Sequence, residues 1–529
     1  MNDWWRGAVF YQIYPRSFMD SSGSGTGDLA GVTERLDHVA DLGVDAIWLS
    51  PFFTSPMADF GYDVADYRDV DPLFGTLEDF DALLARAHGL GLKVIIDQVY
   101  SHTSDRHAWF QESRESRHNA RADWYVWADP APDGRPPNNW QSVFGGPAWT
   151  WDARRQQYYL HNFLAEQPDL NFHNPRVQEA MLDVARFWLE RGVDGFRLDV
   201  ANYYFHDKSL RDNPPAKTPP RLRPYDMQAH IHDRSRPETL GFLERLRALM
   251  DSYGDRMAVA EIGCDHPMER SMEYTSGPRR LHTAYNFTLL DAHKLTPRLI
   301  ASAMAGWTDP AAWPSWSFSN HDVVRAPSRF GDARPPAGLP LLLNALLLSL
   351  RGTIFLYQGE ELGLPQAHVP YERLVDPEGI RFWPHTLGRD GCRTPMPWRS
   401  ALPHAGFSTH EDTWLPMDPH HPALAVDAQT DQPDSVLEQA RALLRLRREA
   451  PALRQGSIKA EALDDALLLV TRRAGNAGTM TALFNLSDTA TELFRDLGAA
   501  TACFTVNGAS LDRGGRAKLP PWSGLFVAG

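Results

Sequence analysis

The chain has 529 residues, of which 43% are hydrophobic and 23% are charged, and this composition is ordinary for a folded globular protein. A formal net charge of −14 argues against nucleic acid or an anionic membrane as a partner, because both are bound by clustered Lys and Arg. The length exceeds one average domain and suits a large α/β barrel that carries insertions and a small appended domain.

The cysteines and the N-terminus indicate a compartment. Cys264, Cys392 and Cys503 are few, odd in number and widely spaced, so they form neither a disulfide framework nor a metal-ligand pattern. The first residues lack the charged and apolar regions of a signal peptide, and no apolar run reaches the length of a membrane span. We therefore expect a cytoplasmic protein that uses no cofactor and has no membrane partner.

The first hundred residues alternate between predicted strands and predicted helices. Residues 8–13, 44–51 and 93–99 are apolar runs of strand length, and helices are expected over 29–42 and 77–90. Strands that alternate with helices pair in parallel, and near-continuous apolar strands are buried on both faces. This part of the chain therefore predicts a parallel sheet covered by helices.

The alternation is interrupted twice and then resumes. Residues 103–172 are rich in Trp, Pro, Asn and Asp and show little periodicity, which predicts an inserted, irregular subdomain. A second irregular segment, 203–235, follows a helix expected over 175–191 and a strand at 193–198. Four further strands complete a count of eight, at 257–260, 283–287, 315–318 and 353–357.

Eight βα units with excursions on the loops after the strands describe a (β/α)8 TIM barrel of the α/β class. We assign residues 1–102 and 173–450 to this barrel, and 103–172 to the subdomain inserted after the third strand. Beyond a helix over 435–448, short alternating strands separated by Gly, Asn and Asp turns predict a C-terminal antiparallel β-sandwich domain over 451–529.

Polar side chains occur where the predicted barrel strands end. The active site of such a barrel lies at the carboxyl ends of its strands, so these side chains are expected around one pocket. A single strand-end Asp is as often a helix cap or a salt-bridge partner, but a coordinated set is not explained by capping. The set comprises Tyr62, Asp63, Asp97, His102, Arg197, Asp199, Glu261, His321 and Asp322.

Asp199 and Glu261 suit the cleavage of a glycosidic bond, which needs one carboxylate and one carboxylic acid across the bond. Arg197, two residues before Asp199, should lower the pKa of that carboxyl and keep it ionised, as a nucleophile requires. Burial and neighbouring carboxylates should raise the pKa of Glu261, which makes it the proton donor. Carboxyl groups about 5–5.5 Å apart would make the reaction retaining.

At these residues the chain resembles the α-amylase family of glycoside hydrolases, and within it the bacterial α-glucosidase and oligo-1,6-glucosidase branch. The resemblance extends over essentially the whole length. Residues 167–171, Gln-Pro-Asp-Leu-Asn, point to this branch rather than to endo-acting amylases. The other matching segments are 44–51, 61–67, 97–102, 195–199, 260–261 and 319–322.

The resemblance implies roles for individual residues. Asp199 would be the nucleophile, Glu261 the acid/base and Asp322 the stabiliser of the transition state. A pair between Asp59 and Arg393 would close the pocket beyond O4 of the terminal glucose, which is the physical basis of exo-action. The residues expected around that glucose are Asp59, Tyr62, His102, Arg197, His321 and Arg393.

Two departures from the family pattern concern metal ions. Family members often carry Asn where this chain has Ser101, and that Asn helps to hold calcium in amylases. In the loop from Asp20 to Asp28, serines occupy positions where relatives have carboxylate or amide ligands, and serine hydroxyls are weak calcium ligands. We expect no tightly bound metal ion in either place.

The linkage preference depends on the residues after the nucleophile. Val200 favours α-1,6 linkages in this branch, whereas the segment 201–235 is similar to α-glucosidases that act on short α-1,4 substrates and transfer glucose to alcohols. Tyr203, Tyr204 and Phe205 are expected to wall the acceptor side. We predict an exo-acting retaining α-glucosidase that favours α-1,4 linkages, hydrolyses a small sugar substrate and also transfers glucose to hydroxyl acceptors.

Three alternatives remain open at this point. Two are enzymes on the same fold: an oligo-1,6-glucosidase, and a relative that acts on sucrose or isomerises it. The third is a non-catalytic binding protein, which would have no reason to keep three acids together with Arg197 and both histidines. The sequence carries no indication of the oligomeric state.

Overall fold

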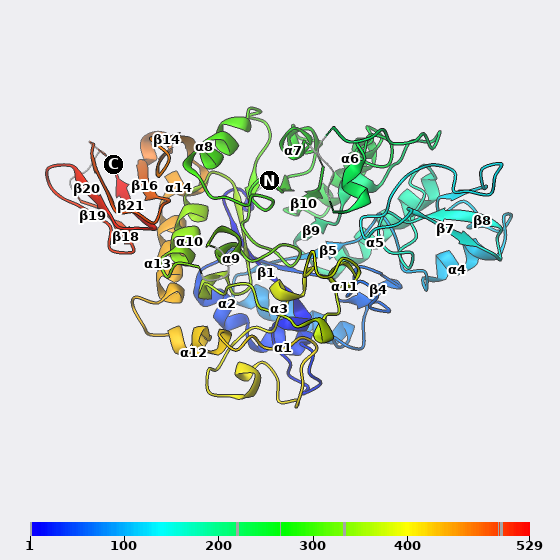
Figure 1. Cartoon of the computed structure of the whole chain (residues 1–529), viewed down its shortest axis with the longest axis horizontal. Coiled ribbons are helices and arrows are strands. Elements are labelled where there is room, and N and C mark those ends of the chain that lie inside the picture. Colours follow the sequence, from blue (N-terminus) through cyan, green and yellow to red (C-terminus); the bar gives the residue numbers. More distant parts are fainter. Residues whose placement is uncertain (1–2, 218–221, 265, 332–334, 496, 498–500) are drawn as a thin grey trace.

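Eight parallel strands form the centre of the molecule (Figure 1). The computed structural model describes residues 3–217, 222–264, 266–331, 335–495, 497 and 501–529. Each of the eight strands was expected from the sequence. They are β1 (Val9–Ile13), β2 (Ala46–Leu49), β5 (Lys93–Gln98), β9 (Gly195–Leu198), β10 (Met257–Ile262), β11 (Thr283–Asn286), β12 (Ser315–Trp316) and β13 (Thr353–Tyr357).

The sheet closes on itself. β1 pairs with both β2 and β13, and the ladder runs through β5, β9 and β10 to β11 on one side and to β12 on the other. Its two ends meet in a parallel bridge between Ala284 and Pro314, beside which the Ser315 hydroxyl donates to the Ala284 carbonyl. The predicted (β/α)8 barrel is confirmed.

Helices surround the barrel, as the alternation predicts. The segment 29–42, expected as one helix, is two helices that break at Arg35, where φ is −104° and ψ is 3°. Asn174 caps the longest helix by accepting from the Arg176 N–H. The helices are α1 (Leu29–Glu34), α2 (Leu36–Leu42), α3 (Leu77–Gly89), α5 (Pro175–Arg191), α6 (Thr239–Asp251), α7 (Pro267–Thr275), α8 (Pro297–Gly306), α9 (Ala326–Gly331), α10 (Leu339–Ser349) and α13 (Val436–Glu449).

The insertion after β5 is more regular than expected. It contains α4 (Ala108–Glu115) and a small antiparallel sheet of β6 (Trp127–Ala128), β8 (Gln157–Leu160) and β7 (Trp149–Asp152). These strands have two to four residues, which is too short for alternation to show in the sequence. Another hairpin, β3 (Phe53–Thr54) and β4 (Asp66–Val70), occupies the loop after β2. Two short helices, α11 (Pro377–Arg381) and α12 (Val426–Gln429), follow β13.

The C-terminal region forms two antiparallel sheets, as predicted. Leu469, Leu483 and Leu525 of the larger sheet pack with Ala517 and Leu519 of the smaller one in a single buried cluster. The larger sheet contains β14 (Ser457–Ala462), β15 (Leu467–Arg473), β16 (Thr479–Asn485), β21 (Ser523–Ala528) and β18 (Phe504–Val506); the smaller contains β17 (Thr491–Phe494), β20 (Arg516–Leu519) and β19 (Ser510–Leu511), and α14 (Pro451–Gln455) precedes both.

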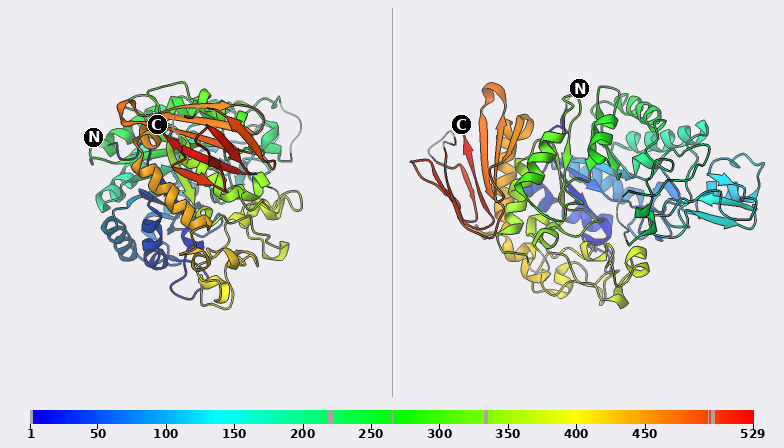
Figure 2. Two further views of the ribbon diagram at one scale, coloured as in Figure 1. Left: turned by 90° about the vertical axis from the view of Figure 1, so that its left-hand side faces the viewer. Right: turned by 45° about the horizontal axis from the view of Figure 1, so that its top comes forward.

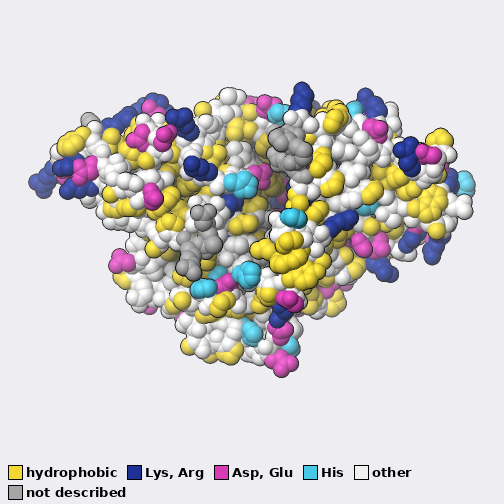
Figure 3. All heavy atoms as spheres, viewed as in Figure 1, with side chains coloured by type: hydrophobic (Ala, Val, Ile, Leu, Met, Phe, Trp, Pro, Cys, Tyr) yellow, Lys and Arg dark blue, Asp and Glu magenta, His cyan; other side chains and the backbone are white. Residues whose placement is uncertain are grey.

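The C-terminal domain and the inserted subdomain lie at opposite ends of the long axis of the molecule, with the barrel between them (Figures 1 and 2). Lys and Arg side chains on the face of Figure 3 gather at these ends and are sparse over the middle, so this face presents no continuous basic surface. Within the described residues, no helix is both long and apolar enough to span a bilayer. The domain limits at 102, 172 and 450 stay a prediction.

Candidate active site

The barrel strands carry apolar side chains inside the barrel and acidic ones at their carboxyl ends. Ile95 on β5 and Val259 on β10 belong to the buried cluster inside the barrel. Side chains two residues apart on a strand share a face, so Asp97 and Glu261 point into the same interior one step further on. Arg197 on β9 lies level with Asp97 in the register. The strand geometry therefore brings these three residues together at one end of the barrel.

Arg197 is the centre of this group. It is fully buried, with its guanidinium over the Trp48 ring. One of its terminal nitrogens lies 2.8 Å from Asp97 and 2.6 Å from Asp199, and the other lies 2.7 Å from Glu261. Three carboxyl groups therefore share a single cation.

Three carboxyl groups around one cation cannot all ionise without a cost in free energy. Burial raises the pKa of Asp199 to about 7 although Arg197 opposes it, so the expectation that Arg197 keeps this pKa low is wrong. Burial raises the pKa of Glu261 further, to about 8, against Arg197 and with help from Asp199 and Asp322. The pKa of Glu261 is therefore higher than that of Asp199, as predicted. As the pH falls, Glu261 takes up a proton before Asp199 does. The neutral Glu261 no longer repels a negative charge on Asp199, which favours the ionised form of Asp199.

Asp322, which follows β12, is contacted by two arginines and a histidine. A terminal nitrogen of Arg393 lies 2.7 Å from its Oδ1, Arg389 lies 3.5 Å from the same oxygen, and His321 lies 3.2 Å from Oδ2. Burial alone would raise the pKa of Asp322, but His321, Arg393 and Arg389 together hold it below its ordinary range. Asp322 is therefore a fixed negative charge while Glu261 holds its proton.

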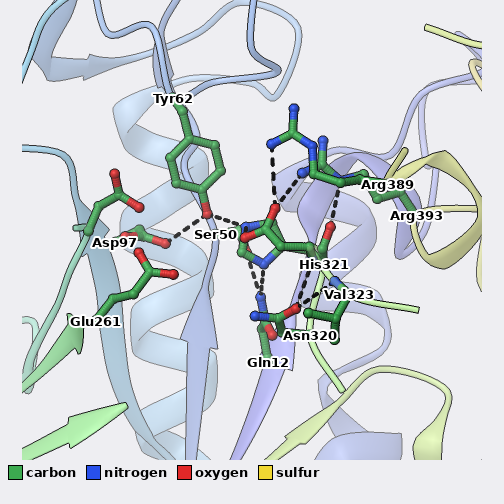
Figure 4. A network of polar contacts seen from close by, with 12 residues as sticks. Gln12, Ser50, Tyr62, Asp97, Glu261, Asn320, His321, Val323, Arg389 and Arg393 are labelled. Atoms are coloured by element: carbon green, nitrogen blue, oxygen red, sulfur yellow. Dashed lines mark hydrogen bonds and ion pairs between the residues drawn. The ribbon is translucent and has the colours of Figure 1, made fainter. Parts of the chain in front are cut away.

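Tyr62 and His321 join the two halves of the site (Figure 4). The Tyr62 hydroxyl lies 2.5 Å from Nε2 of His321 and donates to Asp97 at 3.1 Å, and the two rings stack at 5.4 Å. Gln12 on β1 contacts Nδ1 of His321 at 2.7 Å. Burial lowers the pKa of His321 to about 3, so the ring is neutral in neutral solution. Gln12 was not among the residues expected at the site.

The expected pair between Asp59 and Arg393 does not form. Asp59 is instead bound by Arg389 at 2.8 Å, and Arg389 also contacts Asp376 at 2.7 Å. Arg393 is fully buried; its Nε donates to the His321 carbonyl, and its guanidinium lies on the Asp322 side. Arg389 therefore replaces Arg393 as the partner of Asp59, and Arg393 instead orients the His321–Asp322 segment.

Gln167 is a second site residue that the sequence did not single out, although its segment, 167–171, matches the family. Its amide nitrogen donates to Asp59 at 3.1 Å and lies 3.1 Å from Nε2 of His102. His102 also contacts the Tyr62 carbonyl and the Ser101 hydroxyl through its two ring nitrogens. Burial lowers the pKa of His102 to about 4, so this histidine is also neutral.

Of these residues, Asp59, Tyr62, His102, Asp199, Glu261, Asp322 and Arg389 line a cavity of about 1000 Å³, whereas Arg197, His321 and Arg393 are not part of its lining. Of the three aromatic residues expected on the acceptor side, only Tyr203 faces it. Tyr204 and Phe205 pack against Phe172 in the core instead, so this part of the prediction is wrong. Further lining residues come from the segments that follow β5, β9, β11, β12 and β13: Phe144, Phe163, Val200, Arg223, Tyr225, Asp226, Asp291, Val324 and Glu378.

The acidic groups of the loop from Asp20 to Asp28, where no tightly bound metal ion is expected, take part in the chain's own hydrogen bonds. Asp20 accepts from four backbone N–H groups of residues 22–25 and from the Ser408 hydroxyl. Asp28 caps α1 by accepting from the Gly31 N–H. Asp63, in the loop after β2, accepts from the Ala58 and Asp59 N–H groups and so shapes that loop. The expectation of no bound metal stays a prediction.

The family follows from comparison with known proteins. The α-amylase catalytic-domain model matches residues 12–456, a span that contains nearly the whole barrel and all the acids described above. The chain belongs to the α-amylase family. It is therefore a glycoside hydrolase, and the alternative of a non-catalytic protein is not supported.

Relatives of known name cover nearly the whole chain. It is 57% identical over 499 residues to a probable α-glucosidase of Rhizobium meliloti (strain 1021), covering 92% of this chain and 90% of that protein. It is 36% identical over 526 residues to an oligo-1,6-glucosidase of Heyndrickxia coagulans, covering 92% and 93%. The solved structure of the α-glucosyl transfer enzyme XgtA superposes with a TM-score of 0.95 at 52% identity, over all of both chains. The resemblance to the α-glucosidase and oligo-1,6-glucosidase branch is confirmed.

Proposed function

We propose that this protein is an exo-acting, retaining α-glucosidase that works through a covalent glucosyl-enzyme. The observation that carries the proposal is the placement of Asp199 and Glu261 on one guanidinium, 2.6 Å and 2.7 Å from its two terminal nitrogens. An inverting pair must stand about 6.5–9.5 Å apart to admit a water molecule between acid and base. Two carboxyl groups held against one guanidinium stand close together, which supports double displacement.

The reaction begins with Asp199 ionised and Glu261 protonated. Asp199 attacks the anomeric carbon while Glu261 protonates the departing oxygen, and Asp322 stabilises the positive charge that develops on the sugar. Glu261, now ionised, then removes a proton from water or from another hydroxyl acceptor, which displaces Asp199.

At each stage of the reaction, one of the two acids beside Arg197, Asp199 or Glu261, is ionised and the other is neutral. In the free enzyme the ionised acid is Asp199, and in the glucosyl-enzyme, where Asp199 is an ester, it is Glu261. The net charge around Arg197 is therefore nearly constant while the proton and the glucose move. This constancy avoids the large cost of changing the charge of a buried site.

The anomer released first tests the retaining mechanism. A retaining enzyme acting on an α-glucoside inverts the anomeric carbon twice, so α-glucose should appear first and mutarotate afterwards. Proton NMR of maltose hydrolysis, recorded within the first minutes, follows both anomers. Release of β-glucose first would contradict the proposal.

The same assay decides the linkage. We propose α-1,4 as the preferred linkage, because Tyr203 and the segment behind it, rather than Val200 alone, form the acceptor side. Maltose should then be hydrolysed with a higher kcat/KM than isomaltose or sucrose. The opposite order for isomaltose would favour an oligo-1,6-glucosidase, and isomerisation of sucrose would favour a sucrose-active enzyme.

Exo-action would follow from the closed end of the cavity. Arg389 holds Asp59 and Asp376 there, and replacing it leaves two buried carboxylates without their cation. We expect Arg389→Ala to lower kcat/KM for maltose by about 10²-fold, because truncating one partner of a buried charge pair costs 2–5 kcal/mol. Arg373→Ala is the control, since Arg373 lies in the same excursion but contacts Asp412 at the surface. Equal small effects in both variants would contradict a role for Arg389 in binding.

Transfer of glucose to alcohols and a cytoplasmic location complete the proposal. Transfer requires only that a hydroxyl acceptor competes with water for the glucosyl-enzyme, and the open acceptor side beside Tyr203 gives it access. Cys392 and Cys503 are free thiols, as expected in a reducing compartment. Product analysis with an added alcohol tests the first point, and cell fractionation tests the second.

A further inference from the structure

The residue after Asp199 adopts a backbone conformation that its side chain disfavours. Val200 has φ 35° and ψ 50°, in the left-handed region, where a β-branched residue is an outlier. It forms the turn at which the chain leaves β9 and enters a short 3-10 helix, Ala201–Tyr203. Such strain persists only where the surrounding structure imposes it, and it gathers at functional sites.

The turn directs one backbone N–H at the acid/base. Successive N–H groups of a strand point to opposite neighbours. The Asp199 N–H donates to the Gln98 carbonyl beside β5, so the next N–H points toward β10. There the Val200 N–H donates to Oε2 of Glu261 at 3.0 Å, and this carboxylate takes the place of a backbone carbonyl.

Two N–H groups lie within 3.0 Å of Oε2 of Glu261. Besides Val200, a terminal nitrogen of Arg197 lies 2.7 Å from this oxygen. A proton on Oε2 would point at groups that can only donate, so the acid form of Glu261 avoids it. The other oxygen, Oε1, is then the one that carries the proton.

We propose that Val200 is a positioning residue for proton transfer: its left-handed turn aims its N–H at Oε2 of Glu261 and thereby places the transferable proton on Oε1. This inference rests on the proposed role of Glu261 as the acid/base. It gives Val200 a function through its backbone, in addition to the side chain that lines the cavity. Glycine would adopt the same φ without strain, but it would leave the turn free to rotate.

The charged surroundings of Glu261 determine how the loss of this N–H should act. The N–H favours the ionised form of Glu261 and so lowers its pKa, against the dominant effect of burial. Removing it should raise that pKa. Removing the Val200 N–H leaves the ionisable neighbours of Glu261 in place. Of these, Arg197 lowers the pKa of Glu261, and Asp199 and Asp322 raise it. Asp97 and Tyr285 also lie near enough to interact with Glu261.

The direct test replaces Val200 by its α-hydroxy acid, which keeps the side chain and exchanges the N–H for an ester oxygen. We expect kcat/KM for maltose to fall about tenfold, since a hydrogen bond to a charged group is lost. The value for 4-nitrophenyl α-glucoside should change less than twofold, because nitrophenolate leaves without a proton. The basic limb of the maltose profile should move to higher pH.

A matched ester separates positioning from simple destabilisation. The Ser235 N–H donates to the Asn202 carbonyl in the same turn region, so an ester at Ser235 removes a neighbouring backbone hydrogen bond without touching Glu261. The Ser235 ester should leave kcat/KM for both substrates and the pH profile unchanged. If the Val200 ester lowers kcat/KM by the same factor for both substrates and leaves the pH profile unchanged, the N–H has only a structural role and the proposal fails.

Neutron diffraction of the unaltered protein tests the proposal without any variant. Below the pKa of Glu261 the deuteron should lie on Oε1, with the Val200 N–D pointing at Oε2. A deuteron on Oε2 would overturn the proposal even if the ester variant did not fold. The proposed role of Glu261 itself is tested separately by Glu261→Gln, so failure of the two ideas can be told apart.

Discussion

Asp199→Asn should abolish nearly all activity, lowering kcat for maltose by on the order of 10⁴-fold. The asparagine keeps the size of the side chain and a partner for Arg197, but its amide cannot form the glucosyl ester. Initial rates with maltose and with 4-nitrophenyl α-glucoside measure the loss. kcat should fall by a similar factor for both substrates, because the nucleophile is needed whatever the leaving group.

The control for this variant is Asp194→Asn. Asp194 directly precedes β9, at the other end of the barrel from Asp199, where it contacts Lys93 at 2.9 Å and His88 at 2.7 Å. Its loss should lower stability, while kcat of the folded protein stays within about twofold. Activity of Asp199→Asn within tenfold of the unaltered enzyme would show that the nucleophile is another residue.

Added azide distinguishes the nucleophile from the acid/base by stereochemistry. In Asp199→Gly, azide can fill the space of the lost carboxylate and displace the leaving group once, which gives β-glucosyl azide. In Glu261→Gln, azide attacks the glucosyl-enzyme without needing a base, which gives α-glucosyl azide after two inversions. The opposite products would exchange the roles assigned to the two residues.

Glu261→Gln should produce the second large effect, and this effect should depend on the leaving group. General acid catalysis contributes roughly 10²- to 10⁴-fold, so kcat/KM for maltose should fall by that amount. The value for 4-nitrophenyl α-glucoside should fall far less, because its leaving group needs no proton. Equal losses on both substrates would contradict the assignment of Glu261 as the acid.

The pH profile of the unaltered enzyme follows from the same assignment. Raising the pH through the elevated pKa of Glu261, about 8, removes the proton that maltose cleavage needs, so kcat/KM falls on the basic side. Lowering the pH protonates Asp199 and removes the nucleophile, so kcat/KM also falls on the acid side. In Glu261→Gln the basic limb should disappear.

The barrel could be predicted because its strands are short apolar runs separated by helices of strong periodicity. β5 and β10, for example, are buried along nearly their whole length on both faces, and in the sequence each contains a run of three or four apolar residues followed directly by an acid. The sheet of the inserted subdomain could not be predicted. Its strands of two to four residues are held by long-range pairing rather than by a pattern of their own.

The site residues that the sequence identified all belong to strand ends or recognised segments. Arg389 was missed because two arginines, Arg389 and Arg393, lie close together in one loop, and either could have reached Asp59. A short 3-10 turn at Asp390–Cys392 separates them and gives them different directions. Arg389 faces the cavity beside Phe144, whereas Arg393 is buried beneath Tyr14. No local sequence pattern indicates which of the two arginines contacts Asp59.

The sequence by itself determined which acids stand at the barrel's open end, because strand periodicity and strand order settle which side chains share the interior. Only the tertiary structure decided how these groups act on one another. Arg197 proved to serve Asp97, Asp199 and Glu261 together, so burial outweighs it and the pKa of Asp199 rises rather than falls. The physical reason is that a pKa depends on all the charges and on the solvent excluded around a group. Most of those neighbours lie far away in the chain.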